Sequence, residues 1–283
     1  MVRWRYGMID PVAIRAGLEP GALVPITIYC YDRVGSTMDL AREAVQTLPP
    51  DALPVLIVAD EQTAGRGRLG RRWVAPPGSA LLFSLGLHPP AVATTMPTTL
   101  IWLATVALVE TIEQETPLQA GLKWPNDVLV KTSTGWAKTA GILLEGGWDK
   151  NSLVWAIIGC GININAAPDP QITRYPATAL AIAAETAIDR LRFLHMLMRR
   201  YDYWLRRLYS GESDQLWQTW RNRLLTLGQT VHIHTGNDLV YGTAIDVERN
   251  GSLIVREPSG TLRRIESGDV GLVDDHSRNI NEV

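Results

Sequence analysis

Residues 53–59, LPVLIVA, and residues 65–71, GRGRLGR, decide the expected fold of this chain. The first stretch is a short apolar run rich in β-branched residues, which predicts a buried strand. The second packs three glycines and three arginines into seven residues. Glycine lets a backbone turn through positive φ and approach a ligand closely, whereas arginine offers a rigid fork of donors that suits carboxylate or phosphate. The sequence therefore predicts a strand followed by a loop that wraps an anion.

The loop also matches the letters G-x-G-x-x-G, which would indicate a dinucleotide-binding fold if the last glycine opened a helix. The residues that follow include Pro76, Pro77 and Gly78, which exclude a helix long enough to present its N-terminus to a pyrophosphate. A Walker A loop is excluded because the chain contains no Gly-Lys-Ser or Gly-Lys-Thr. Arg-Gly segments that bind nucleic acid come in longer tracts than this single copy. A loop for a phosphate, a carboxylate or both is the interpretation that remains.

Composition limits the partners of the chain. Its 283 residues are 46% hydrophobic, enough for one large core and a small second domain. Lys and Arg total 27 against 29 Asp and Glu, so the net charge of −2 gives no electrostatic case for DNA, RNA or a membrane as the main partner. Cys30 and Cys160 lack a metal-binding spacing, the N-terminus lacks the apolar run of a signal peptide, and apolar runs such as residues 100–109 are too short to span a bilayer. We therefore expect a globular protein of the reducing cytoplasm.

Hydrophobic periodicity predicts a mixture of strands and helices over most of the chain. Pro and Gly punctuate the first 25 residues, which predicts a lead-in arm with at most one short helix. Ser36-Thr37-Met38-Asp39 is a capping box that begins a helix. Strands are expected at residues 26–31, 53–59, 81–87, 141–145 and 153–158, and helices at residues 36–46 and 98–114. This pattern is typical of an α+β domain with a mixed sheet.

The last third of the chain changes from helical to β-rich at Gly228. Residues 191–225 have a helical pattern with a break at Ser210-Gly211, and their aromatic residues have the spacing of a packed core face. His232 and His234 share one strand face, and without a third ligand they indicate a surface pair and no zinc site. Short strands separated by turn signals are expected at residues 230–234, 240–247, 253–256, 261–265 and 270–273. These strands predict a small β-barrel.

Three polar constellations lie beside expected strands. Residues 123–127, KWPND, place a cation, an aromatic ring, an amide and a carboxylate around a turn that proline fixes. Lys138 stands just ahead of the apolar run at residues 140–144. Residues 159–165, GCGININ, end a hydrophobic strand with small residues, where a backbone can approach a flat ligand. Each of these alone also fits an ordinary strand end with solvated polar groups, whereas together they indicate a binding site.

These motifs resemble those of the biotin protein ligases in order and spacing. The resemblance rests on residues 65–71, residues 123–127, Lys138 ahead of Ala140-Gly141-Ile142, and residues 161–163. It spans about residues 28–275 and implies a catalytic domain like that of class II aminoacyl-tRNA synthetases, followed by an SH3-like β-barrel.

The resemblance also implies a domain organisation. The expected parts are an N-terminal arm at residues 1–25, a catalytic biotin/lipoate ligase-like domain at 26–226, the β-barrel at 227–275 and a flexible tail at 276–283. Some family members carry an N-terminal helix-turn-helix domain and repress transcription. The chain ahead of Tyr29 is too short to hold such a domain, so we expect a ligase-only protein that binds no operator DNA.

The activity implied by the resemblance is that of an ATP-dependent biotin–[acetyl-CoA-carboxylase] ligase. The biotin carboxylate attacks the α-phosphate of ATP to give biotinyl-5′-AMP and pyrophosphate, and an acceptor lysine then attacks that mixed anhydride. The implied ligands are biotin, ATP and Mg²⁺, with Mg²⁺ carried by the ATP phosphates and no certain protein ligand for it. The implied acceptor is a biotin carboxyl carrier protein. A homodimer is left open, and neither DNA nor a membrane is an expected partner.

The family's functional residues fall on matching positions of this chain. By resemblance, Lys138 bridges the biotin carboxylate and the α-phosphate, Arg68 holds the phosphate and closes the loop, and Asp127 orients the acceptor amine or binds metal. Many relatives have Asn where this chain has Met38, so one contact to the ureido group of biotin is expected to be missing. Biotin is expected at Ser36, Thr37, Gln62, Gly65, Arg66, Lys138 and Gly141. The nucleotide is expected at Arg68, Arg71, Trp73, Lys123, Trp124, Asn126 and Asn163.

Two other functions fit parts of the sequence. Lipoate ligases share the domain type and the adenylation chemistry, but the loop at residues 65–71 and the polar pair Ser36-Thr37 favour a ureido ligand over a dithiolane. The other is a non-enzymatic module whose β-barrel captures peptides while the basic loop grips RNA. The near-neutral net charge and the scarcity of basic residues between residues 142 and 172 disfavour that module.

Overall fold

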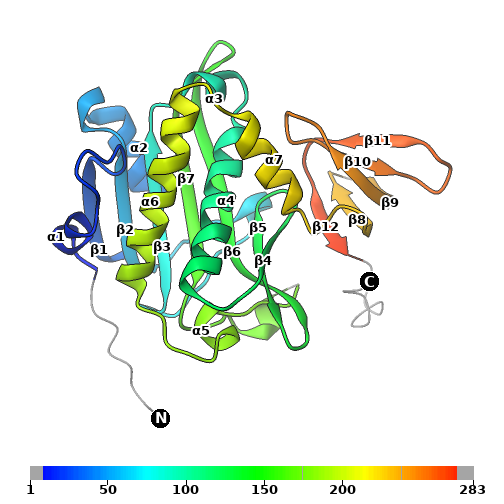
Figure 1. The fold of residues 1–283 in the computed structure, drawn as a ribbon, viewed down its shortest axis with the longest axis horizontal. Helices are drawn as coiled ribbons and strands as arrows, with labels where there is room; N and C mark the ends of the chain where they lie inside the picture. Colours follow the sequence, from blue (N-terminus) through cyan, green and yellow to red (C-terminus); the bar gives the residue numbers. More distant parts are fainter. Residues whose placement is uncertain (1–8, 174, 237, 273–283) are drawn as a thin grey trace.

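A seven-stranded mixed sheet carries the larger part of the fold (Figure 1). The structure, a computed structural model, describes residues 9–173, 175–236 and 238–272. The strand order is β1-β2-β3-β7-β6-β5-β4, in which β1 and β2 are parallel and every other neighbouring pair is antiparallel. The strands are β1 (Thr27–Val34), β2 (Val55–Gln62), β3 (Ala80–Leu87), β4 (Ala120–Lys123), β5 (Asp127–Thr132), β6 (Gly135–Asp149) and β7 (Ser152–Asn163).

Helices cover both faces of this sheet. On one face α4 (Thr98–Glu115) and α6 (Arg190–Tyr209) lie side by side, and α2 (Thr37–Thr47) packs on the other (Figure 1). Because successive side chains of a strand point to opposite faces, Leu56 of β2 joins the core under α4 and α6, whereas Val55 packs with α2. The shorter helices are α1 (Pro11–Ala16), α3 (Ala91–Thr95), α5 (Leu180–Ala183) and α7 (Asp214–Asn222), with 3₁₀ turns η1 (Pro50–Ala52), η2 (Arg68–Gly70) and η3 (Pro170–Ile172).

Helices α2 and α6 begin where capping residues satisfy their first N–H groups. The Ser36 side chain accepts a 3.3 Å hydrogen bond from the Met38 N–H at the start of α2. At the start of α6 the Asp189 carboxylate accepts from the N–H groups of Leu191 and Arg192, at 2.8 and 3.1 Å. Ser36 is therefore held at a helix terminus, next to the end of β1.

A second sheet of five antiparallel strands follows α7 (Figure 1), and we call it the C-terminal sheet. Its order is β11-β10-β9-β8-β12, so the last strand pairs with the first one. Its hairpins turn at glycines with positive φ, such as Gly251 (φ 89°) and Gly260 (φ 88°). The strands are β8 (Thr230–Thr235), β9 (Asp238–Val247), β10 (Leu253–Arg256), β11 (Leu262–Ile265) and β12 (Asp269–Leu272).

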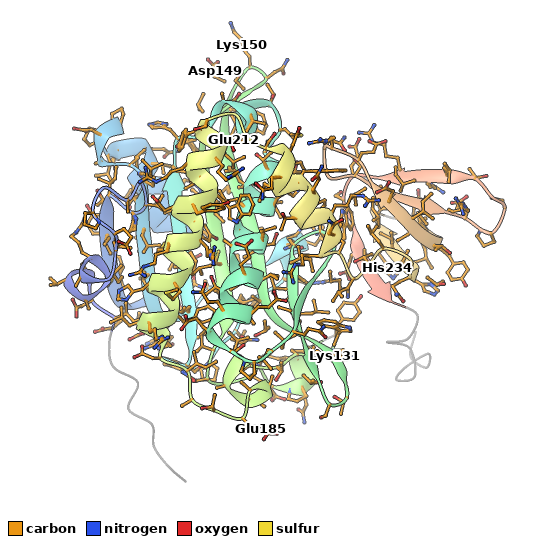
Figure 2. All side chains as sticks on the ribbon, in the orientation of Figure 1. Lys131, Asp149, Lys150, Glu185, Glu212 and His234 are labelled. Atoms are coloured by element: carbon orange, nitrogen blue, oxygen red, sulfur yellow. The ribbon has the colours of Figure 1, made fainter. Side chains whose placement is uncertain are left out.

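The expected α+β class with a mixed sheet and a C-terminal β-domain is confirmed. Two short strands, β4 and β5, were not predicted, because they have only four and six residues and the segment between them carries the Trp-Pro turn. β6 and β7 are longer than predicted, since they pair as a hairpin whose turn at Asp149 and Lys150 projects from the sheet (Figure 2). The first eight residues of the expected arm, residues 273–275 of the expected barrel and the tail at 276–283 lie outside the described residues.

Candidate functional site

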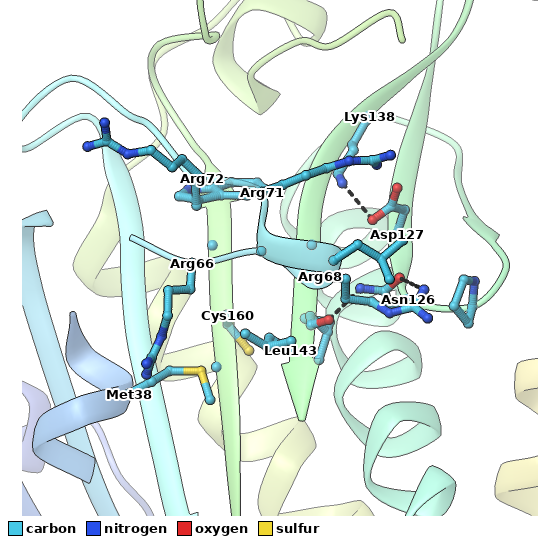
Figure 3. A pocket seen from close by; sticks show the side chains of 18 of the residues that line it. Met38, Arg66, Arg68, Arg71, Arg72, Asn126, Asp127, Lys138, Leu143 and Cys160 are labelled. Carbon is cyan, nitrogen blue, oxygen red and sulfur yellow. Dashed lines mark hydrogen bonds and ion pairs between the residues drawn. The ribbon is translucent and has the colours of Figure 1, made fainter. Parts of the chain in front are cut away.

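The glycine- and arginine-rich loop folds back on itself after β2. The Trp73 N–H donates to the Gly65 carbonyl at 3.0 Å and the Gly67 N–H donates to the Arg71 carbonyl at 2.8 Å. The tip is the η2 turn, where Leu69 (φ 56°) and Gly70 (φ 72°) both have positive φ. The loop is thus a narrow hairpin that projects arginine side chains across the central strands (Figure 3).

The floor beneath the loop is made of glycines. A Cβ on Gly161 of β7 would lie 2.3 Å from the Trp73 ring, and one on Gly141 of β6 would lie 3.2 Å from it. Gly159 plays the same part under α2, since a Cβ there would lie 2.4 Å from the Met38 sulfur. The glycines therefore let an indole ring and a thioether rest directly on the backbone of the sheet.

Replacing Gly161 with alanine is expected to lower the free energy of unfolding by about 1–3 kcal/mol, because the added methyl group overlaps the Trp73 ring. Chemical denaturation of the two proteins would measure the loss. Trp73→Ala in the same chain removes the overlapping ring, so the loss caused by Gly161→Ala should be smaller in that background. Equal losses in both backgrounds would contradict the contact.

The loop arginines differ in their partners. The Arg66 guanidinium pairs with Asp39 of α2 at 2.9 Å and with Glu145 of β6 at 3.9 Å. It points toward Met38 and away from Lys138 (Figure 3). The expectation that biotin contacts the Arg66 backbone stays a prediction, and the side-chain charge of Arg66 is directed to these two carboxylates.

The side chains of Arg71 and Arg72 also form hydrogen bonds with other protein groups. Arg71 Nη1 donates to Asp269 Oδ1 at 3.1 Å, and its Nη2 binds the second oxygen of the same carboxylate. This hydrogen-bonded pairing raises the pKa of Arg71. Arg72 donates to the Thr63 carbonyl at 2.8 Å.

Arg68 differs because its partners are neutral. Its Nη1 donates to the Asn126 side-chain oxygen and to the Gly268 carbonyl, each at 3.3 Å. Within the described ranges no carboxylate lies within ion-pair distance of Arg68, and burial lowers the pKa of its guanidinium. Arg68 is partly buried, and a cation in such a place with only long hydrogen bonds to neutral groups gains from a bound anion.

Lys138 is fixed on both sides of its backbone. β5 pairs with it at Leu129 through a register shift, and on the other edge the Lys138 N–H donates to the Pro176 carbonyl at 2.8 Å. The ammonium group lies 2.6 Å from Asp127 Oδ1 and 5.7 Å from the centre of the Trp73 ring. The lysine and its carboxylate partner therefore stand together at the edge of the glycine floor (Figure 3).

A polar corner lies under the other end of the loop. Gln62 Oε1 accepts from the Thr37 N–H at 2.8 Å and from the Thr37 hydroxyl at 3.0 Å. The Thr37 hydroxyl also shares a 2.8 Å hydrogen bond with Ser84 of β3. Because its side-chain oxygen already accepts hydrogen bonds from Thr37, the Gln62 amide has its NH₂ group to donate to a ligand. Sequence reasoning missed Ser84, although a buried serine in the apolar run of residues 80–87 was a signal.

Two cavities meet at this site. The first, of about 130 Å³, contains the polar corner and an apolar side formed by Met38, Leu143 and Cys160. The second, of about 580 Å³, lies toward the segment around Tyr175 and includes Asn163. The residues that line both cavities are Arg71, Arg72, Trp73 and Lys138. Trp73 and Lys138 therefore form the boundary between two adjoining binding spaces.

Asn163 lines the second cavity. Its amide donates to the Thr178 carbonyl at 3.2 Å, while its side-chain oxygen is buried without a hydrogen-bond partner in the described part of the chain. Such an oxygen favours a ligand with a donor, such as an amino group.

Three expected nucleotide residues lie deeper than the loop. Trp124 is buried, and its indole N–H donates to the Gly251 carbonyl of the C-terminal sheet at 2.8 Å. Lys123 is buried, with its ammonium 3.5 Å from the centre of the Tyr175 ring. Asn126 contacts Arg68 and donates to the Ile142 carbonyl, so it supports the arginine. The contacts of Trp124 link the two sheets.

Comparisons with known proteins support one family. The family model for biotin/lipoate A/B protein ligases matches residues 31–163, and that for the biotin protein ligase C-terminal domain matches residues 226–273.

In the described part of the chain, no helix has the length and apolar character needed to cross a membrane.

Curated relatives are similar over most of the chain. The bifunctional ligase/repressor BirA of Bacillus subtilis is 32% identical over 268 residues, 94% of this chain and 80% of that protein. The biotin–[acetyl-CoA-carboxylase] ligase of Mycobacterium tuberculosis is 31% identical over 249 residues, 84% of this chain and 86% of that protein. The structure of the biotin protein ligase from Aquifex aeolicus in complex with biotin and ATP aligns with a TM-score of 0.70 and 26% identity, over 87% of this chain and 98% of that one.

Proposed function

This chain belongs to the biotin protein ligases and is an ATP-dependent ligase, and from that premise we propose that it makes biotinyl-5′-AMP and transfers the biotinyl group to a lysine of a biotin carboxyl carrier protein. One observation carries this proposal. Lys138 and Trp73 line both cavities, so ligands in the two spaces would have their reacting ends at the same ammonium group. A reaction that joins a carboxylate to a phosphate needs this arrangement.

Biotin would occupy the first cavity. Its ureido group would contact Ser36, Thr37 and the Gln62 amide, and its apolar ring would lie along Met38 and the glycine floor. The carboxylate would then point to Lys138. The missing amide at Met38 is consistent with a pocket that relies on fewer polar contacts.

ATP would occupy the second cavity. Its adenine amino group is the kind of donor that the free side-chain oxygen of Asn163 requires. The α-phosphate would reach Lys138 and Arg68, because Arg68 is the loop arginine whose hydrogen-bond partners in the described ranges are neutral. Mg²⁺ would be brought by the triphosphate, since this ion is commonly held by substrate phosphates together with water.

The chemistry follows from these positions. A biotin carboxylate oxygen attacks the α-phosphorus, the bond from that phosphorus to the bridging oxygen breaks, and pyrophosphate leaves. Lys138 and Arg68 offset the repulsion between the two anions and stabilise the charge of the transition state. The acceptor lysine amine then attacks the acyl carbon of the anhydride, and AMP leaves. We propose that Asp127, which lies 2.6 Å from Lys138, accepts the proton that the amine releases.

Exchange of labelled pyrophosphate into ATP tests the first half-reaction. We expect exchange that depends on biotin and on Mg²⁺, and none with lipoate as the acid. Exchange with lipoate alone would support a lipoate ligase, and exchange with neither acid would overturn the assignment. Mass spectrometry of a carrier domain and its Lys→Arg variant tests the second half-reaction, with one biotinyl group expected on the native domain and none on the variant.

A further inference from the structure

The C-terminal sheet reaches into the site through the start of β12. Gly268, Asp269 and Val270 line the first cavity, although they lie some two hundred residues beyond the loop in the chain. A Cβ on Gly268 would lie 2.6 Å from Ile233 and 3.0 Å from the His234 carbonyl oxygen. The turn before β12 is therefore packed tightly against β8, and its backbone offers a fixed point of attachment.

Two consecutive residues at this point hold two arginines of the loop. The Gly268 carbonyl accepts from Arg68, and the Asp269 carboxylate binds Arg71 through both oxygens. Asp269 is the more enclosed partner, with 13% of its side chain exposed against 48% for Arg71. A two-point arginine–carboxylate contact fixes orientation as well as distance.

The geometry points to Asp269 as a positioning residue for the loop. By holding Arg71, it sets the orientation of the loop tip and so aims Arg68 at the phosphate. This inference rests on the proposed function. It also assigns Arg71 a role different from the expected nucleotide binding. The Arg71 guanidinium is bound to the Asp269 carboxylate, so it anchors the loop, and phosphate binding is left to Arg68.

The chain offers a matched control for this inference. Asp246 of β9 pairs with Arg221 of α7 at 2.7 Å, so it too joins an arginine outside the C-terminal sheet to a carboxylate of that sheet. It lines neither cavity. Asp269→Asn and Asp246→Asn therefore each weaken an arginine–carboxylate pair of the C-terminal sheet, one at the loop and one away from it.

We expect Asp269→Asn to raise the KM for ATP and the rate of biotinyl-AMP release by about 10-fold, with the Kd for biotin within about twofold of the native value. Asp246→Asn should change none of these quantities by more than about twofold. Asp269→Glu should restore part of the loss, because the carboxylate is kept. Similar losses in both asparagine variants, or no loss in Asp269→Asn, would overturn the inference.

Trypsin supplies a readout that does not need the reaction. It cuts after arginine, and the loop contains Arg66, Arg68, Arg71 and Arg72. Cleavage within the loop should be faster in Asp269→Asn than in Asp246→Asn, and Arg71→Gln should match Asp269→Asn at the remaining sites. If the native protein shows no biotin-dependent pyrophosphate exchange, the proposed function fails. The cleavage rates would still test whether the contact between Asp269 and Arg71 holds the loop. Equal cleavage in the two asparagine variants would show that Asp269 does not hold the loop.

Discussion

Replacing Lys138 with glutamine is expected to lower biotin-dependent pyrophosphate exchange by a factor of about 10²–10³, the usual cost of removing one group that stabilises charge in a transition state. The side chain lines both cavities, so its charge serves the carboxylate and the phosphate together. Its loss also leaves Asp127 without the ammonium that lies 2.6 Å away, which adds repulsion at the same point. Exchange rates at saturating biotin and ATP would measure the effect.

Lys131→Gln is the matched control for this loss. Lys131 is an exposed lysine of β5 that lies 5.5 Å from the centre of the Trp136 ring, outside both cavities (Figure 2). We expect its exchange rate to stay within about twofold of the native rate. If Lys138→Gln exchanged pyrophosphate as fast as Lys131→Gln, Lys138 would have no part in the mechanism.

Replacing Arg68 with glutamine is expected to speed the escape of biotinyl-AMP by about 10²-fold while adenylate synthesis stays measurable. Arg68 is a partly buried cation of the loop, and its neutral partners at 3.3 Å leave its charge available to the phosphate of the intermediate. Lys138 remains in the variant, so the anhydride can still form. The measurement is the dissociation rate of labelled biotinyl-AMP from the purified complex.

Arg33→Gln controls for the removal of an arginine charge. Arg33 of β1 pairs with Glu61, its side chain is exposed and it lines neither cavity, so the intermediate should dissociate at nearly the native rate. Retention of biotinyl-AMP by Arg68→Gln for as long as by Arg33→Gln would refute the assigned role of Arg68.

Long and strongly periodic segments were predictable from sequence, and weak or short ones were not. The apolar run of β3 and the capped start of α2 carry local signals, and both were found. β4 and β5 form because each pairs with a neighbour across a turn, and such pairing leaves little trace in four to six residues.

The residues of the site also differ in how far the sequence predicted them. Lys138, residues 65–71 and residues 161–163 could be proposed from motif and resemblance, since their residue types fit an anionic ligand. The resemblance also assigned the phosphate to Arg68, but the partners of the other loop arginines could not be predicted, because they are carboxylates distant in the chain. Asp39 takes Arg66 and Asp269 takes Arg71, and nothing in the loop sequence distinguishes these arginines from Arg68.

The glycine floor also limits how the site could be redesigned. Gly141, Gly159 and Gly161 have no side chain to shorten, so the space beneath a ligand is already at its maximum. The walls differ, because Met38 fills its place with a flexible thioether that a smaller residue could replace. Engineering this enzyme to accept a bulkier acid would therefore have to begin at Met38 and proceed along the walls.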